Sequence, residues 1–283
     1  MNATDTSDTT STTSTADATD TADYRRGLKA LENLEGCSPP SILEALADIA
    51  PGLGTMVVTF VYGQLYARPD LHLRHRQLVT IAALAAMGNA RPQLKFHVGG
   101  ALQAGCTPLE VVETMVHLAV YAGFPVALNA VFAVQEVLRE KGLEPLAVDA
   151  VVAESCARDR FAEGWKVLQQ VDGHGGEAVI ASLAGVAPDL GRFIIEFAFG
   201  DVYTRPGLGL LERELVTIAA LAAMGTGAPQ LRVHLHGFLN VGGSREQMVE
   251  ALIHIAAYAG FPAAINGMTI AREVLAERDR RPG

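Results

Sequence analysis

A 137-residue repeat constrains the fold of this chain more than any other feature of its sequence. The segment LVTIAALAAMG at 78–88 returns unchanged at 215–225, and HLAVYAGFP from His117 returns as HIAAYAGFP from His254. A period this long indicates two copies of one domain rather than a solenoid of short units. We therefore predict domains at 23–141 and 160–278, joined by a connector at 142–159.

The remaining segments and the composition narrow the class of protein. Residues 1–22 are nearly all Thr, Ser, Asp and Ala and lack the features of a signal peptide, so they are expected to form a disordered tail. No apolar run is long enough to span a membrane, and we expect a cytoplasmic protein. The net charge of −9 argues against a nucleic-acid partner, and three widely spaced cysteines without a CxxC argue against a thiol redox centre.

The pattern within each copy predicts helices throughout. Residues 78–87 are apolar on almost every side and precede Gly88, which is typical of a buried helix with a glycine C-cap. Because this helix and its copy at 215–224 are apolar all round, we expect them to pack against another copy. Pro92 suits the first turn of the next helix, and TPLE at 107–110 and SREQ at 244–247 are capping boxes. The fold class is all-α, with two tandem helical domains.

Polar side chains recur on these apolar helices. Glu250, His254 and Tyr258 lie four residues apart and share one helix face, as do their counterparts Glu113, His117 and Tyr121. His97 and His234 each follow a Gln at the same spacing, Gln93 and Gln230. A buried histidine on an apolar helix is most often a structural residue, which is the favoured interpretation of His117 and His254. For His97 and His234 we favour a functional role.

Several chemistries lack their motifs. The sequence contains no HExxH, Cys pair or acidic cluster that would complete a metal site, and no GxSxG, Walker or GxGxxG motif. The residues that remain are Arg, Glu, His and Tyr. They predict acid–base chemistry without a metal or organic cofactor.

Three segments in a fixed order resemble the carboxymuconolactone decarboxylase family, which includes the AhpD-like alkylhydroperoxidases. They are RPGLGLLERELVTIAALAAMG, QLRVHLHGFLNVG and HIAAYAGFPAAING. The resemblance covers roughly 45–140 and 182–277. It implies two tandem AhpD-like helical domains in one chain, equivalent to two protomers of the family. Three such chains are then expected to form a six-domain ring. The peroxidase branch requires a CxxC ahead of the helix histidine, and this chain has none.

The family's named reaction implies a carboxy-lyase of aromatic catabolism that acts on a small carboxylated ring. By that resemblance His234 donates a proton, Glu214 orients it, and His254 and Tyr258 form a second hydrogen-bonding tier. Arg205 or Arg213 is expected to bind the substrate carboxylates, and Gln230 and Gln93 are also expected to bind substrate. The first copy's versions are Arg68, Arg76 and His97.

The chain departs from the family pattern at three glutamines. Gln93 and Gln230 replace the usual Glu four residues before the helix histidine, and Gln77 stands where the second copy has Glu214. An amide cannot titrate, so the second copy is expected to carry the chemistry while the first builds the pocket or an interface. Two alternatives stay open. One is a related enzyme that dehydrates, isomerises or cyclises another ring, and the other is a non-catalytic binding or scaffold protein.

Overall fold

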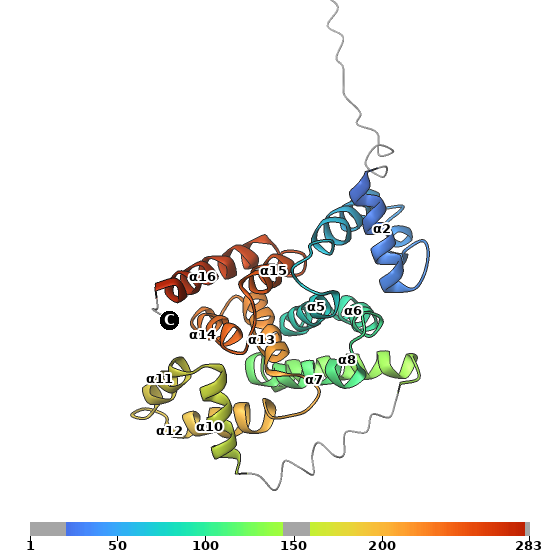
Figure 1. Cartoon of the computed structure of the whole chain (residues 1–283). Coiled ribbons are helices and arrows are strands. Elements are labelled where there is room, and N and C mark those ends of the chain that lie inside the picture. The colour runs from blue at the N-terminus through green and yellow to red at the C-terminus, as the bar shows by residue number, and fades with distance from the viewer. Residues whose placement is uncertain (1–20, 144–158, 281–283) are drawn as a thin grey trace, which may run out of the picture. The chain divides into compact units, whose positions relative to one another are not determined.

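A computed structural model describes residues 21–143 and 159–280 (Figure 1). These residues form helices and no strand. The chain consists of two compact units, residues 1–67 and 68–283. The predicted all-α fold is confirmed. Most of the tail at 1–22 and of the connector at 142–159 lies outside the described residues, and so does Cys156. In the part of the chain that is described, no helix is long and apolar enough to cross a bilayer.

Residues 21–67, the described part of the first unit, form α2 (Ala22–Glu35), α3 (Ser41–Ala45), α4 (Pro51–Met56) and the π-helix η1 (Val57–Leu65). Helix α2 packs on η1 at very short range, because a Cβ on Gly27 would lie 2.0 Å from the Val58 carbonyl oxygen. Gly164 makes the same approach to Ile195 in the second copy, also at 2.0 Å. This explains why both glycines occur in the repeat.

The second unit contains the rest of both copies. From the first copy come α5 (Leu73–Met87), α6 (Arg91–Gln103), α7 (Pro108–Tyr121) and α8 (Phe124–Glu140). The second copy begins with α10 (Arg160–Val171), α11 (His174–Leu183), α12 (Pro188–Phe193) and the π-helix η2 (Ile194–Val202). It continues with α13 (Leu210–Met224), α14 (Ala228–Asn240), α15 (Arg245–Ile255) and α16 (Phe261–Arg280).

The predicted helix ends are confirmed where a local signal specified them. Gly88 closes α5 in the left-handed conformation, with φ of 70°, as expected for a glycine C-cap. Both capping boxes form, at Thr107 and at Ser244. Pro92 lies in the first turn of α6. These ends depend on a few neighbouring residues, which is why sequence reasoning identified them.

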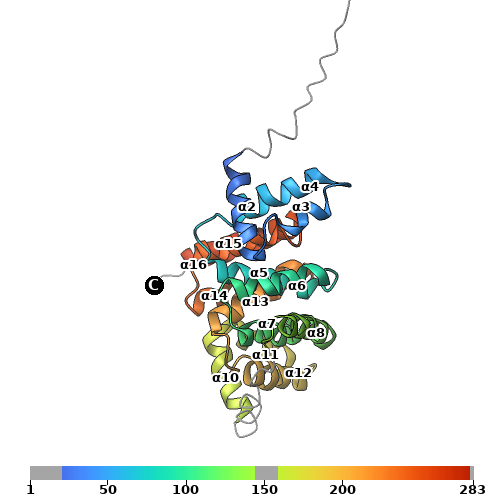
Figure 2. The ribbon, with the colours of Figure 1, turned by 90° about the vertical axis from the view of Figure 1, so that its right-hand side faces the viewer.

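Helices α5 and α13 lie side by side at the centre of the second unit (Figures 1 and 2). Both are buried along nearly their whole length, and they share one apolar core with helices from both copies. The expectation that 215–224 packs against another copy is therefore confirmed within a single chain. The compact units consequently do not follow the ends of the repeat. Each central helix needs apolar neighbours on all sides, and the other copy supplies them.

Apolar side chains remain exposed on two helices of this unit, at equivalent positions of the repeat. Phe124, Leu128 and Phe132 on α8 are each more than half exposed, and so are Phe261 and Ile265 on α16. The association of three chains into a ring stays a prediction.

Candidate functional site

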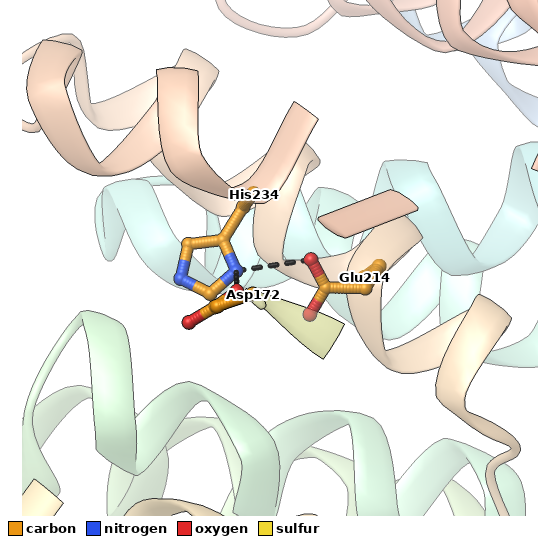
Figure 3. A group of neighbouring side chains, drawn as sticks. All are labelled: Asp172, Glu214 and His234. Carbon is orange, nitrogen blue, oxygen red and sulfur yellow. Dashed lines mark hydrogen bonds and ion pairs between the residues drawn. The ribbon is translucent and has the colours of Figure 1, made fainter. Parts of the chain in front are cut away.

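His234 lies between two carboxylates in the interior of the second unit. Its Nδ1 is 2.9 Å from Oε2 of Glu214 on α13 and 3.7 Å from Oδ1 of Asp172, the residue that follows α10 (Figure 3). Figure 3 shows the second ring nitrogen directed away from Glu214. All three side chains are at least nine-tenths buried. Residues from α13, from α14 and from the C-terminal end of α10 thus converge on one imidazole.

The two carboxylates decide the charge of the imidazole. Burial alone would lower the pKa of His234, but the negative charges of Glu214 and Asp172 outweigh it and raise this pKa to about 9. Burial, together with the charge of Glu214, raises the pKa of Asp172 to about 6 although His234 opposes the shift. Near neutral pH the second copy therefore holds a protonated histidine in a buried site.

Two tyrosines complete the surroundings of Glu214. The hydroxyl of Tyr203 donates to Oε1 of Glu214 at 2.6 Å and lies 2.6 Å from the hydroxyl of Tyr121. The ring of Tyr121, which comes from the first copy, packs edge-on against His234 at 5.0 Å. Burial and the nearby carboxylates raise the pKa of both phenols well above the usual range, so both stay protonated. Glu214 thus has a polar partner at each oxygen, which fixes its orientation.

A glycine makes room for the two carboxylates. Gly237 is on α14, three residues beyond His234, and a Cβ there would lie 2.7 Å from Oε2 of Glu214 and 3.3 Å from Oδ1 of Asp172. Any larger residue would push Glu214 away from the histidine. The requirement is steric, since this glycine lies within a helix.

The first copy places an amide where the second has the carboxylate. Nδ1 of His97 lies 3.1 Å from Oε1 of Gln77, and the ring of Tyr258 packs edge-on against His97 at 5.1 Å. Burial lowers the pKa of His97 to about 3, and the amide offers no charge to oppose it. His97 is therefore neutral at physiological pH. Two histidines at equivalent positions differ in charge because Glu214 and Asp172 act on His234, whereas only burial acts on His97.

The histidines of the ladder, His117 and His254, are buried and neutral. The Thr217 hydroxyl donates to the Arg213 carbonyl at 2.9 Å, so it must accept from Nε2 of His117 at 2.8 Å. Nδ1 of His117 then faces the Arg213 guanidinium, and burial together with that charge holds the pKa of this imidazole well below its usual range. His254 makes the equivalent contact with Thr80 at 2.9 Å, and its pKa is lowered in the same way.

The sequence analysis grouped His254 and Tyr258 with His234, and the structure separates them. Tyr258 packs on His97, while Tyr121 of the first copy packs on His234. The tyrosine of each copy packs on the histidine of the other copy, because α7 contacts α13 and α15 contacts α5. The second tier beside His234 is therefore Tyr121 and Tyr203, not Tyr258.

The arginines expected to bind substrate are paired within the chain instead. Arg205 contacts Glu113 at 2.7 Å and Arg213 contacts it at 3.3 Å, and Glu113 is completely buried. Glu250 likewise pairs with two first-copy arginines, Arg68 at 2.6 Å and Arg76 at 2.9 Å. Each pair joins one copy to the other. The two glutamines assigned to substrate, Gln93 and Gln230, are exposed.

Sequence reasoning missed Asp172, Tyr203 and Gly237 as neighbours of His234. Tyr203 belongs to the repeat through Tyr66, but its distance in sequence from His234 hid the contact. Asp172 has an acidic counterpart in Glu35, which was the one available signal. That segment repeats only faintly, so the signal was weak.

Asp172, Glu214 and His234 also form the kind of group that holds a metal ion. Ligand atoms of the three lie within 4.8 Å of one another. The sequence analysis expected no metal, because these residues are 20 or more positions apart and form no ligand motif. An ion here would replace the proton that His234 shares with Glu214, since both need the same lone pairs. Proton and metal are thus competing occupants of one site.

Comparisons with known proteins show the family of this chain. The sequence model of the Carboxymuconolactone decarboxylase family matches residues 51–136 and 188–273. The chain therefore belongs to this family, as a tandem duplication of its domain.

Two curated relatives are named decarboxylases. The 4-carboxymuconolactone decarboxylase of Acinetobacter baylyi is 38% identical over 117 residues, which are 41% of this chain and 86% of that protein. The nitrosuccinic acid decarboxylase of Metarhizium robertsii is 31% identical over 121 residues, which are 42% of this chain and 82% of that protein. A solved structure from Burkholderia xenovorans, named as a gamma-carboxymuconolactone decarboxylase subunit, has a TM-score of 0.55 over 90% of this chain and 98% of its own. At 21% identity, that likeness concerns the fold alone.

Proposed function

We propose that this protein is a carboxy-lyase that decarboxylates a small organic acid, with His234 as the proton donor and Glu214 as the group that keeps it charged. The observation that carries the proposal is the contrast between the copies. His234 is held protonated by two carboxylates, whereas His97 faces an amide and is neutral. A buried, charged acid is costly to maintain, and such groups concentrate at catalytic sites.

The reaction follows from the charge of the imidazolium. When the bond to the carboxylate breaks, CO2 leaves and its bonding electron pair stays on the substrate carbon, delocalised into an adjacent electron-withdrawing group. The positive charge of His234 stabilises this developing negative charge. His234 then gives its proton to the carbon and becomes neutral, and a proton from water restores it. Glu214 and Tyr203 keep the ring oriented throughout.

The relatives' names supply two candidate substrates. Both 4-carboxymuconolactone and nitrosuccinic acid carry more than one carboxyl group, together with a carbonyl or nitro group that accepts electrons. A lactone of aromatic catabolism is the first candidate because the relative of that name has the higher identity. The substrate class we propose is therefore a small dicarboxylic acid.

The test is CO2 release by the EDTA-treated protein with each candidate in turn. We expect turnover of at least one acid without added metal. Absence of turnover with both acids would contradict the proposal and favour another reaction or a binding role. Turnover that disappears with EDTA and returns with Zn²⁺ or Mn²⁺ would contradict the proton-donor role and assign the three side chains to a metal.

The substitution Gly237→Ala tests the steric requirement. We expect the chain to fold, because the end of the Glu214 side chain can move, but kcat should fall by on the order of tenfold to a hundredfold as the carboxylate leaves its position. The matched control is Gly99→Ala, where the new Cβ would only touch Cε of Lys141 at 3.6 Å. Equal kcat values for the two variants would show that the position of Glu214 does not matter.

A further inference from the structure

Asp172 brings to the His234 site a buried carboxylate oxygen that forms no hydrogen bond. The side chain is nine-tenths buried, and its Oδ1 has no hydrogen-bond partner among the described residues. That oxygen lies 3.7 Å from Nδ1 of His234, while Oε2 of Glu214 lies 2.9 Å from the same nitrogen (Figure 3). Because a buried oxygen without a partner is costly, it indicates that a further group binds there.

The three side chains have the separations that a tetrahedral metal ion requires. Zn²⁺ binds histidine nitrogen and carboxylate oxygen at about 2.0–2.2 Å, so its ligand atoms lie about 3.4 Å apart. The distances of 2.9 and 3.7 Å from Nδ1 of His234 fall on either side of this value. All three ligand atoms lie within 4.8 Å of one another. Small side-chain movements are therefore enough to bring all three onto one ion.

A glycine leaves room for an ion beside both carboxylates. A Cβ on Gly237 would lie 2.7 Å from Oε2 of Glu214 and 3.3 Å from Oδ1 of Asp172, so the absence of a side chain keeps this space open. Asp172 also lines a pocket of about 490 Å³ between α10, α11, α14 and α16. This pocket offers an ion a path to the site.

The contacts and the charge of the group also suit a divalent cation. The Tyr203 hydroxyl donates to Oε1 of Glu214 at 2.6 Å, which orients the carboxylate and leaves Oε2 for an ion. Two ionised carboxylates and a neutral imidazole carry two negative charges. A divalent cation neutralises both of them, whereas the proton of His234 neutralises only one. Because unbalanced charge is costly in a buried site, the group favours the cation.

The first copy lacks this group. Gln77 stands at the position of Glu214, and its neutral amide oxygen lies 3.1 Å from Nδ1 of His97. Among the residues that the structure describes, Asp172, Glu214 and His234 are the one group of three such side chains that could hold an ion. The difference between the copies that sets the charge of the histidine thus also sets where a metal can bind.

We propose that Asp172, Glu214 and His234 bind a divalent transition-metal ion such as Zn²⁺ through Oδ1, Oε2 and Nδ1, and that the bound ion inhibits the carboxy-lyase. Mg²⁺ and Ca²⁺, which prefer six or more oxygen ligands, fit this set of three less well. The ion takes the lone pair of Nδ1, and the proton that His234 shares with Glu214 leaves to water. The imidazole is then neutral, and it is a much weaker acid than an imidazolium. Binding of the ion does not depend on the proposed function, whereas the inhibition rests on it.

Binding is measured apart from turnover, by calorimetry with Zn²⁺ on the full chain after EDTA treatment and removal of the chelator. We expect wild type to bind one equivalent, and Asp172→Asn to bind it at least about tenfold more weakly, since even outer partners of a ligand change metal affinity by about 10- to 100-fold. This variant should fold, because Oδ1 of Asp172 has no hydrogen bond to lose. Co²⁺ provides a second measurement, since tetrahedral Co²⁺ absorbs visible light far more strongly than hydrated Co²⁺.

A second variant and a matched control guard against misfolding and surface binding. Glu214→Gln should also lose the bound Zn²⁺, and the first copy already accepts Gln at the equivalent position. The control is His174→Asn, because the exposed His174 forms a surface pair with Glu177, in which Nδ1 lies 3.2 Å from Oε2. We expect His174→Asn to bind Zn²⁺ as wild type does.

The outcomes separate the two proposals. Zn²⁺ that fails to bind wild type, or binds equally to wild type and both site variants, overturns the metal site even if CO2 is released. Binding that both variants lose supports the metal site even if neither candidate acid is decarboxylated, in which case the proposed function alone fails. With a substrate that turns over, one equivalent of Zn²⁺ should stop CO2 release and EDTA should restore it. Unchanged or faster release by the Zn²⁺-loaded protein would overturn the inhibition.

Discussion

Replacement of Glu214 by Gln is expected to reduce kcat by about 10²- to 10⁴-fold. The chain itself contains the comparison, because Gln77 already occupies the equivalent position beside His97. The pKa of His97, beside the amide, is about 3, and the pKa of His234, beside Glu214 and Asp172, is about 9. An imidazole without its proton cannot act as a donor. The measurement is the rate of CO2 release at saturating substrate.

The control for Glu214→Gln is a carboxylate away from the site. Glu273→Gln removes a charge from the half-exposed pair with Arg232, and kcat should stay close to that of wild type. Folding is expected to survive in the Glu214 variant, since the first copy accepts Gln in the same position. If Glu214→Gln kept the wild-type kcat while remaining folded, the assignment of the proton donor would be wrong.

Replacement of Glu113 by Gln is expected to lower the free energy of unfolding by about 3–5 kcal/mol. Glu113 is completely buried and pairs with Arg205 and with the equally buried Arg213. Without the carboxylate, a buried guanidinium loses its counter-charge, and the free-energy cost of removing it from water is no longer offset. The measurement is urea unfolding followed by circular dichroism.

An exposed pair provides the comparison for Glu113. Glu136 pairs with Arg91 at 2.6 Å, and both side chains are about half exposed. Glu136→Gln should therefore cost at most about 1 kcal/mol. If the two variants had equal stability, the buried ion pairs between the copies would not hold the second unit together.

The fold was largely predictable because its signals are local. Gly88, Pro92 and the box at Thr107 define helix ends through contacts within a few residues. The apolar run at 215–224 predicted a helix with partners on every side. The exchange of side chains between the copies was not predictable, because nothing near His254 in sequence indicates that it lies beside Thr80.

The site was predictable in part. The sequence predicted that His234 and Glu214 act together, and in the structure Nδ1 of His234 lies 2.9 Å from Oε2 of Glu214. The carboxylate partners of the arginines were not predictable, because a sequence shows a cation but not the carboxylate that contacts it, and Glu113 is 92 residues from Arg205. Asp172 was missed for the same reason, because it belongs to a segment that repeats only faintly.

The most direct test of the account is the titration of the histidine rings by NMR in the wild-type protein. His234 should be protonated at pH 7 and should lose its proton near pH 9, while His97 should stay neutral between pH 5 and 9. A neutral His234 at pH 7, or equal titration of His234 and His97, would contradict the claim that the second copy carries the proton donor.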